Sequence, residues 1–169
     1  MAHNIILITW NEPSKAFEGF NKLKNSPIQN INEITLLKRQ ENGNFKIEEQ
    51  LDPRQDSGLV GGGLLGALIG ILGGPLGIVL GFTAGALLGE SYDINHEQDD
   101  MAVLTKISQA LPEESTGLLI DAYEESEDFI DALFDKTDAT IYRWSFDDVQ
   151  SEIEASVEAW HESQRIANV

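Results

Sequence analysis

The three histidines are the natural starting point for metal chemistry, because imidazole nitrogens are common ligands of transition metals. They are His3, His96 and His161, and no two of them have the spacing of an H-E-x-x-H motif. His96 stands in the acidic run NHEQDD, where Asp99 or Asp100 could join it in weak metal binding. An exposed acidic loop explains the same run more simply, so we predict no metal site.

Two further motifs fail at required positions. From residue 93 to 99 every second position is acidic or an amide, as in a calcium loop, but Gln98 and Leu104 replace its glycine and its glutamate. The letters of G-x-G-x-x-G occur at residues 61–66, but a repeating glycine frame produces such matches by chance. The strand–turn–helix context and the Lys-Ser/Thr of a phosphate loop are both missing.

Nucleophile signatures are also missing. The chain has no cysteine and no G-x-S-x-G motif. Carboxylate pairs are abundant, but in so acidic a chain abundance does not define a catalytic pair. We therefore predict a protein that is not an enzyme, with no catalytic residues and no cofactor.

An uncharged, glycine-rich stretch dominates the middle of the chain. It lies between Asp56 and Glu90 and holds 12 of the 15 glycines. Glycines recur every four residues in two frames, which places them on one face of each of two helices. The frames break at Gly73, Gly74 and Pro75, where paired glycines and a proline favour a turn. We predict a hairpin of two apolar helices that self-associates through Gly58, Gly62, Gly66, Gly70, Gly74, Gly77, Gly81, Gly85 and Gly89.

This hairpin must be covered by something. It carries 15 large apolar side chains, and burying each is worth about 1.5–3 kcal/mol, whereas a whole domain is stable by only about 5–15 kcal/mol. Lipid, other copies of the chain or its own domain could supply the cover. As helices, residues 58–73 and 76–89 would be about 24 and 21 Å long, shorter than a bilayer core of about 30 Å. A thinned bilayer, a re-entrant hairpin and an oligomer core all remain open.

The formal net charge of −18 is concentrated after the glycine-rich stretch. Residues 90–169 carry 21 acidic and 4 basic side chains, against 8 and 7 in residues 1–89. Such a surface repels nucleic acid, which we exclude as a partner, and it offers no polybasic attraction to anionic lipid. Its simplest role is a solvated face that keeps an association-prone protein dispersed.

Periodicity outside the stretch predicts an α+β fold. Strands are expected at residues 4–10, 31–40, 45–51, 116–125 and 139–146, with an Asn-Gly turn between the second and third. Helices are expected at residues 11–25, capped by Asn11 or Ser14, at 98–111, at 126–138, and after Ser145. This order predicts a ferredoxin-like (split βαβ) sheet with helices on one face, a three-layer α/β arrangement being the alternative.

The expected domain organisation follows from these elements. Residues 1–56 form the first half of the α/β domain, residues 57–89 the inserted glycine-zipper helical hairpin, and residues 90–169 the second half with an extra C-terminal amphipathic helix. The apolar stripe of that last helix comprises Phe146, Val149, Ile153, Val157 and Trp160.

Four segments resemble a bacterial family of uncharacterised proteins, described as predicted membrane proteins (a domain of unknown function). The segments are NIILITW, ITLLKRQENGNFKIEEQLD, GGGLLGALIGILGGPLGIVLGFTAGALLG and STGLLIDAYEE. The resemblance implies a small α/β domain with an inserted glycine-zipper hairpin, and it implies no activity. The chain departs from the family in its C-terminal helix and its acidity.

We therefore expect a non-enzymatic, self-associating protein whose hairpin mediates homo-oligomerisation in or on the membrane. The N-terminal residues MAHNIILITW lack the basic region of a signal peptide, so we expect the cytoplasmic side of the cell membrane. The alternative is a soluble cytoplasmic homo-oligomer whose hairpins form a buried protein core without lipid. A third hypothesis, a ligand-binding module, rests on fold analogy alone.

Overall fold

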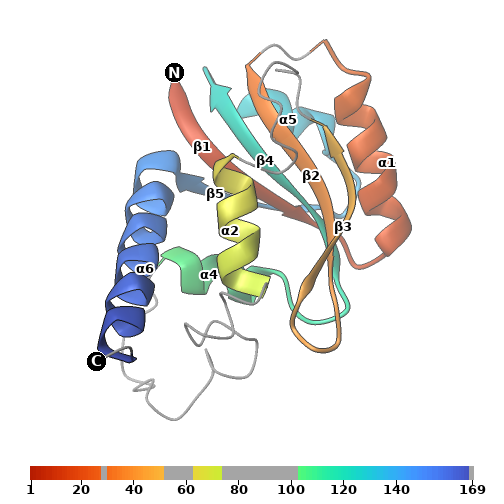
Figure 1. Ribbon diagram of the computed structural model, residues 1–169. Helices are drawn as coiled ribbons and strands as arrows, with labels where there is room; N and C mark the ends of the chain where they lie inside the picture. The colour runs from red at the N-terminus through yellow and green to blue at the C-terminus, as the bar shows by residue number, and fades with distance from the viewer. Residues whose placement is uncertain (28–29, 52–62, 74–102, 168–169) are drawn as a thin grey trace, which may run out of the picture.

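Five strands form one antiparallel sheet in the spatial order β3-β2-β4-β1-β5 (Figure 1). The computed structural model describes residues 1–27, 30–51, 63–73 and 103–167. Every neighbouring pair of strands runs antiparallel, and the α+β class expected from the sequence is confirmed. The elements are β1 (Ala2–Thr9), α1 (Pro13–Lys24), β2 (Ile31–Arg39), β3 (Phe45–Leu51), α2 (Leu64–Gly73), α4 (Val103–Ala110), β4 (Thr116–Glu124), α5 (Asp128–Leu133), β5 (Thr140–Ser145) and α6 (Phe146–Ala167).

Two helical crossovers connect parallel strands. β1 and β2 are parallel because each pairs antiparallel with β4, which lies between them. α1 makes that connection. In the same way β4 and β5 are parallel, with β1 between them and α5 as the connection.

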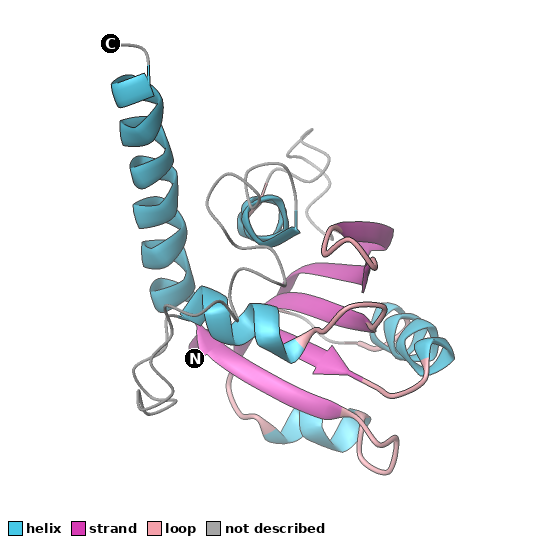
Figure 2. Cartoon of the chain, turned by 90° about the horizontal axis from the view of Figure 1, so that it is seen from below, coloured by secondary structure: helices cyan, strands magenta, loops and turns pink. Residues whose placement is uncertain are grey.

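Helices cover both faces of the sheet (Figure 2). Successive side chains of a strand point to opposite faces, so in β1 Ile5 and Leu7 enter one core while Ile6 and Ile8 enter the other. The first core is completed by α2, α4 and α6, and we call this side the α2 face; the second is completed by α1 and α5, and we call it the α1 face. The expectation of helices on one face was wrong, because the unbroken apolar run of β1 requires cover on both sides.

The turn between β2 and β3 confirms the Asn-Gly prediction. Gly43 has a φ of 85°, in the left-handed region that favours glycine. The backbone N–H of Gly43 donates to Gln40 O at 2.9 Å, and that of Gln40 donates to Asn44 O at 2.7 Å. These bonds close the turn between β2 and β3. β3 itself is the edge strand on this side of the sheet.

The first helix begins as expected but is capped differently. Pro13 is its first residue, which suits a position where the N–H has no helical partner. The N-cap residue is Glu12, without a side-chain capping bond. The expectation that Asn11 or Ser14 would cap this helix was therefore wrong.

The last helix is long and leaves the sheet. α6 follows directly after Ser145, as predicted, and its first turns bury Val149 and Ile153 on the α2 face. Its C-terminal half runs away from the sheet on the side where α2 lies (Figure 2), and Ile166 is 69% exposed. The side chain of Trp160, the last member of the predicted stripe, lies outside the described residues.

Candidate functional sites

The structure describes part of the predicted glycine zipper. Gly66 and Gly70 lie on α2, and Gly73, predicted to turn the chain, is the last residue of α2 and is buried against Phe45. The other predicted positions lie outside the described residues: Gly58, Gly62, Gly74, Pro75, Gly77, Gly81, Gly85 and Gly89, together with His96, Asp99 and Asp100.

α2 buries its large side chains on its own sheet. Leu65, Leu68 and Ile71 are completely buried, in one core with Leu37 of β2 and Leu119 of β4. Each such burial contributes about 1.5–3 kcal/mol. The sequence left lipid, other copies of the chain and its own domain as possible partners for these side chains. On this side of α2 the chain's own domain buries them. In the described residues, every helix is too short or too polar to cross a membrane.

The opposite side of α2 carries only small residues. At about 100° per residue, Gly66, Ala67 and Gly70 fall within about a third of the helix circumference. Ala67 is exposed, and the two glycines are half-buried. A Cβ built at Gly70 would meet no described atom within 4 Å. α2 thus presents a smooth outer surface, which we call the glycine face (Gly66, Ala67 and Gly70).

A histidine–aspartate pair joins the strands at one end of the α2 face. His3 Nε2 of β1 lies 2.5 Å from Asp121 Oδ1 of β4, and Asn32 Nδ2 of β2 donates to the same oxygen at 3.1 Å. The imidazole stacks between the rings of Tyr123 and Phe146, with centroid distances of 4.0 and 3.7 Å. Because both ring faces and Nε2 are occupied, this pair acts as a structural clamp. In the sequence analysis His3 was weighed only as a possible metal ligand, and no sequence motif indicated that it would pair with Asp121.

A second buried carboxylate lies beside the start of α2. Glu33 of β2 lies opposite Asp121 in the strand register, and its Oε1 accepts a bond from Gln50 Nε2 at 2.6 Å. A Cβ built at Gly63, just before α2, would lie 2.9 Å from Glu33 Oε2. A carboxylate at a helix N-terminus is favourable because that end of the helix carries partial positive charge. The Glu33 carboxylate of the sheet therefore lies beside the N-terminal end of α2, where its charge is favourable.

Arg39 is the one cation buried inside the α2 face among the described residues. Its Nη1 donates to the carbonyls of Ser108 and Leu111 at 2.6 and 3.0 Å, at the end of α4. Its Nε donates to Gly43 O at 3.3 Å in the β2–β3 turn. Burial lowers the pKa of Arg39, against the opposing charge of Glu113. The guanidinium therefore joins the end of α4 to the turn between β2 and β3.

Arg143 organises a charged network on the α1 face. It forms a forked ion pair with Glu124, with Nε–Oε2 at 3.0 Å and Nη2–Oε1 at 3.1 Å. Its Nη2 also bonds Asp131 Oδ1 of α5 at 2.8 Å, and Asn4 Nδ2 donates to Glu124 Oε2 at 2.8 Å. Burial alone would lower the pKa of Arg143, but its bonds to Glu124 and Asp131 and their charges raise it.

A cavity of about 530 Å³ opens on the α1 face, between α1 and the loop after α5. Its lining includes Lys15, Lys22 and Lys136, three of the seven lysines of the chain. Trp10 and Phe134 also line it, with their rings edge to face at 5.5 Å. The sequence offered one weak signal, the seven-residue spacing of two lysines on α1, and none for Lys136, which the fold brings from far along the chain.

Metal chemistry finds no support in the described residues, where no three His, Cys, Asp or Glu side chains are placed to hold an ion. No protein-family model matches the chain, and comparisons with curated proteins and with solved structures also found no match.

Proposed function

We propose that this chain is a non-enzymatic, self-associating protein whose glycine-rich segment forms the contact between copies. The observation that carries the proposal is the division of α2 into two unlike faces. Its leucine and isoleucine side is already buried on the sheet, whereas its glycine face carries no large side chain, Ala67 is exposed, and a Cβ at Gly70 would meet no described atom within 4 Å.

Such a face suits close packing of another helix. Small residues spaced by four let two backbones approach closely, and the gain in contact offsets the poor helix propensity of glycine. Gly66 and Gly70 have this spacing. After the break at residues 73–75, a second glycine frame with the same four-residue spacing follows at residues 77–89, so a second helix with a matching face is available from this chain or from another copy.

The finer fold is part of this proposal. The order β2-β4-β1-β5, together with the crossovers through α1 and α5, supports a ferredoxin-like arrangement of those four strands. β3 would then be an added edge strand, and α2 the first arm of the inserted hairpin. Membership in the family of predicted membrane proteins rests on the four segments quoted above and is likewise a proposal.

The location of the assembly is a separate question. We propose that it lies in or on the cytoplasmic membrane, and the alternative is a soluble particle. The burial of the leucines of α2 on the sheet favours an assembly in which the first arm stays on its own domain. Density-gradient flotation of a detergent-free lysate distinguishes the two arrangements. Protein that rises with lipid supports the membrane assembly, and protein that sediments free of lipid supports the soluble one.

Self-association is tested by leucine substitution on the glycine face. A Cβ at Gly70 would meet no described atom within 4 Å, so we expect the described part of the fold to accommodate Gly70→Leu, which would block close approach of another helix. We expect sedimentation velocity to show a smaller species for Gly70→Leu and for Ala67→Leu. Ala155→Leu adds the same side chain at an exposed position of α6 and should leave assembly size unchanged. A wild-type monomer, or an unchanged size in both glycine-face variants, would refute the proposal.

A further inference from the structure

The lysine-lined cavity lies on the α1 face, across the sheet from the glycine face. We propose that it binds a small organic anion, whose carboxylate or phosphate group lies among Lys15, Lys22 and Lys136. This inference goes beyond self-association and does not depend on it.

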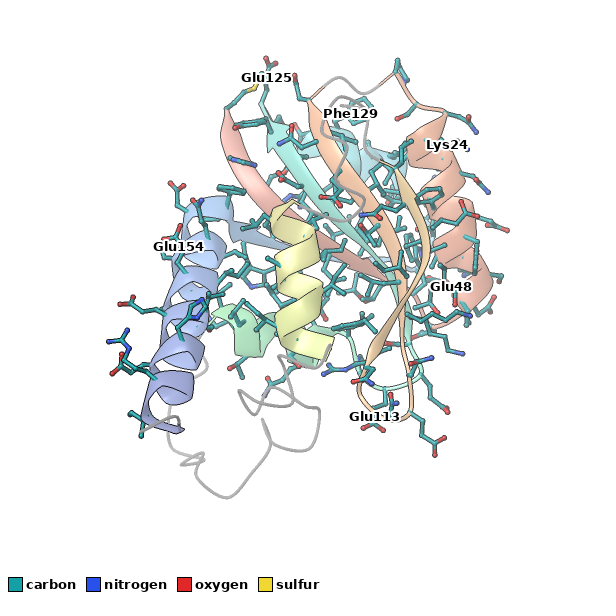
Figure 3. The ribbon with its side chains drawn as sticks, viewed as in Figure 1. Lys24, Glu48, Glu113, Glu125, Phe129 and Glu154 are labelled. Carbon is teal, nitrogen blue, oxygen red and sulfur yellow. The ribbon has the colours of Figure 1, made fainter. Side chains whose placement is uncertain are left out.

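The charge of the cavity is opposite to that of the protein. Three lysines and one acidic residue, Glu18, line it, whereas the chain as a whole carries a net charge of −18. Acidic side chains such as Glu48, Glu113 and Glu154 point outward around the rest of the molecule (Figure 3). A local positive site in such a field attracts a compact anion, while the surrounding charge repels an extended polyanion. A small molecule therefore fits better than nucleic acid.

The lysines are only partly satisfied by the protein. Lys15 Nζ pairs with the exposed Asp138 at 3.2 Å, and Lys22 Nζ donates to the carbonyl of Leu133 at 2.9 Å. No ion pair in the described part of the chain includes Lys22 or Lys136. Since an ammonium group has three donors, all three side chains retain donors for a ligand.

The aromatic wall of the cavity is held by burial and by a hydrogen bond. Trp10 and Phe134 are almost fully buried, and the indole N–H of Trp10 donates to Thr137 Oγ1 at 3.1 Å. Lys136 and Asp138, in the loop beside the cavity, have φ values of 65° and 61°. Non-glycine residues in this left-handed region cost about 1–2 kcal/mol each, and such strain gathers at binding sites.

The size and the remaining lining agree with a small polar ligand. About 530 Å³ lies within the range of ligand pockets, about 300–1,000 Å³. Asn21, Asn25 and Thr137 add amide and hydroxyl groups to the lysines. These groups suit an anion that also carries hydroxyl or carbonyl oxygens.

Saturation-transfer difference NMR tests the proposal on the intact protein, because it observes the ligand whatever the size of the assembly. The probes are phenyl phosphate, benzoate and benzyl alcohol, which share a ring and differ in the attached group. We expect saturable binding of phenyl phosphate or benzoate in the millimolar range, and none of benzyl alcohol. The tighter of the two anions identifies the ligand as a phosphate or a carboxylate.

Lysine variants locate the binding. Lys22→Ala together with Lys136→Ala should raise the Kd of the bound anion by about fivefold or more, the worth of two partly exposed charge contacts. Lys24→Ala is the matched control, because Lys24 is the last residue of the same helix (Figure 3) but is not among the residues that line the cavity. Binding of the neutral alcohol as tight as that of the anions, equal loss in the control, or no saturable binding by any probe would overturn the proposal.

Discussion

The indole ring of Trp10 lies directly against the backbone of α1 at Gly19. A Cβ built at Gly19 would stand 2.6 Å from Trp10 Cη2 and 3.2 Å from Phe134 Cε1. Gly19 therefore lets α1 approach the end of β1 at a distance that no other residue permits. All three residues of this contact line the lysine-lined cavity.

Gly19→Ala should destabilise the protein. Alanine gains about 1 kcal/mol of helix propensity over glycine, but here its methyl group would force apart a buried ring held by a hydrogen bond to Thr137. Overpacking of this kind costs about 1–3 kcal/mol. We expect a net loss of about 1 kcal/mol in the free energy of unfolding, measured by urea denaturation.

The matched control is Gly70→Ala on α2. A Cβ there meets no described atom within 4 Å, so helix propensity should act alone and raise stability by about 0.5–1 kcal/mol. The two alanine variants are thus expected to change stability in opposite directions. If Gly19→Ala were as stabilising as Gly70→Ala, the close packing of Trp10 on α1 would be refuted.

Arg39→Met should destabilise the protein by about 2–3 kcal/mol, because the carbonyls of Ser108 and Leu111 would lose a charged donor. The burial that lowers the pKa of Arg39 opposes folding, and its removal recovers part of the loss. Even a lowered pKa leaves an arginine charged at neutral pH, so the loss should be the same at about pH 6 and pH 8.

Denaturant titration of Arg39→Met and of Arg165→Met measures this effect. Arg165 is exposed on α6 and pairs only with Glu162 among the described residues, so its variant should change stability by less than about 0.5 kcal/mol. Equal stabilities of the two variants would contradict a structural role for the buried guanidinium.

The sheet was predictable because its strands carry local signals. The apolar run of β1 and the Asn-Gly turn each specify their own structure, and each appeared where expected. The prediction that helices cover only one face was wrong, although the unbroken apolar run of β1 already indicates a strand that is buried on both faces. The sequence order of helices does not say to which face each will pack.

The cavity and the charged networks could not be predicted in the same way. Lys22 and Lys136 are 114 positions apart in sequence, and only the crossover through α5 brings the second beside α1. The pairing of His3 with Asp121 likewise depends on the register between β1 and β4. Long-range register is set by the packing of the whole sheet, which a single sequence does not display.

Arg143 should couple more strongly to Glu124 than to Glu127. The Glu124 side chain is 5% exposed and forms the forked pair, whereas that of Glu127 is 68% exposed and lies 3.9 Å from Nη1. Double-mutant cycles with Arg143→Met, Glu124→Gln and Glu127→Gln should give about 1.5–3 kcal/mol for the first pair and under about 1 kcal/mol for the second.

The pH dependence of that coupling has a definite sign on the alkaline side. The folded pKa of Arg143 is raised above its ordinary value, so its contribution to stability is complete below that ordinary value and is lost only as the pH rises through the raised folded pKa. The coupling should therefore be unchanged between about pH 7 and pH 9. A coupling that declined across this interval would show that another group carries it.

His3→Phe should test the clamp at the end of the sheet. Phenylalanine keeps the stack between Tyr123 and Phe146 but removes the partner of Asp121, whose carboxylate would stay buried with only the bond from Asn32 among described groups. Leaving a buried acceptor underpaired costs about 1–3 kcal/mol, whereas replacing both partners by apolar groups can be nearly neutral. The double variant His3→Phe/Asp121→Leu should therefore recover stability lost in His3→Phe, measured by urea denaturation. A double variant less stable than the single one would show that Asp121 holds β2 and β4 together independently of His3.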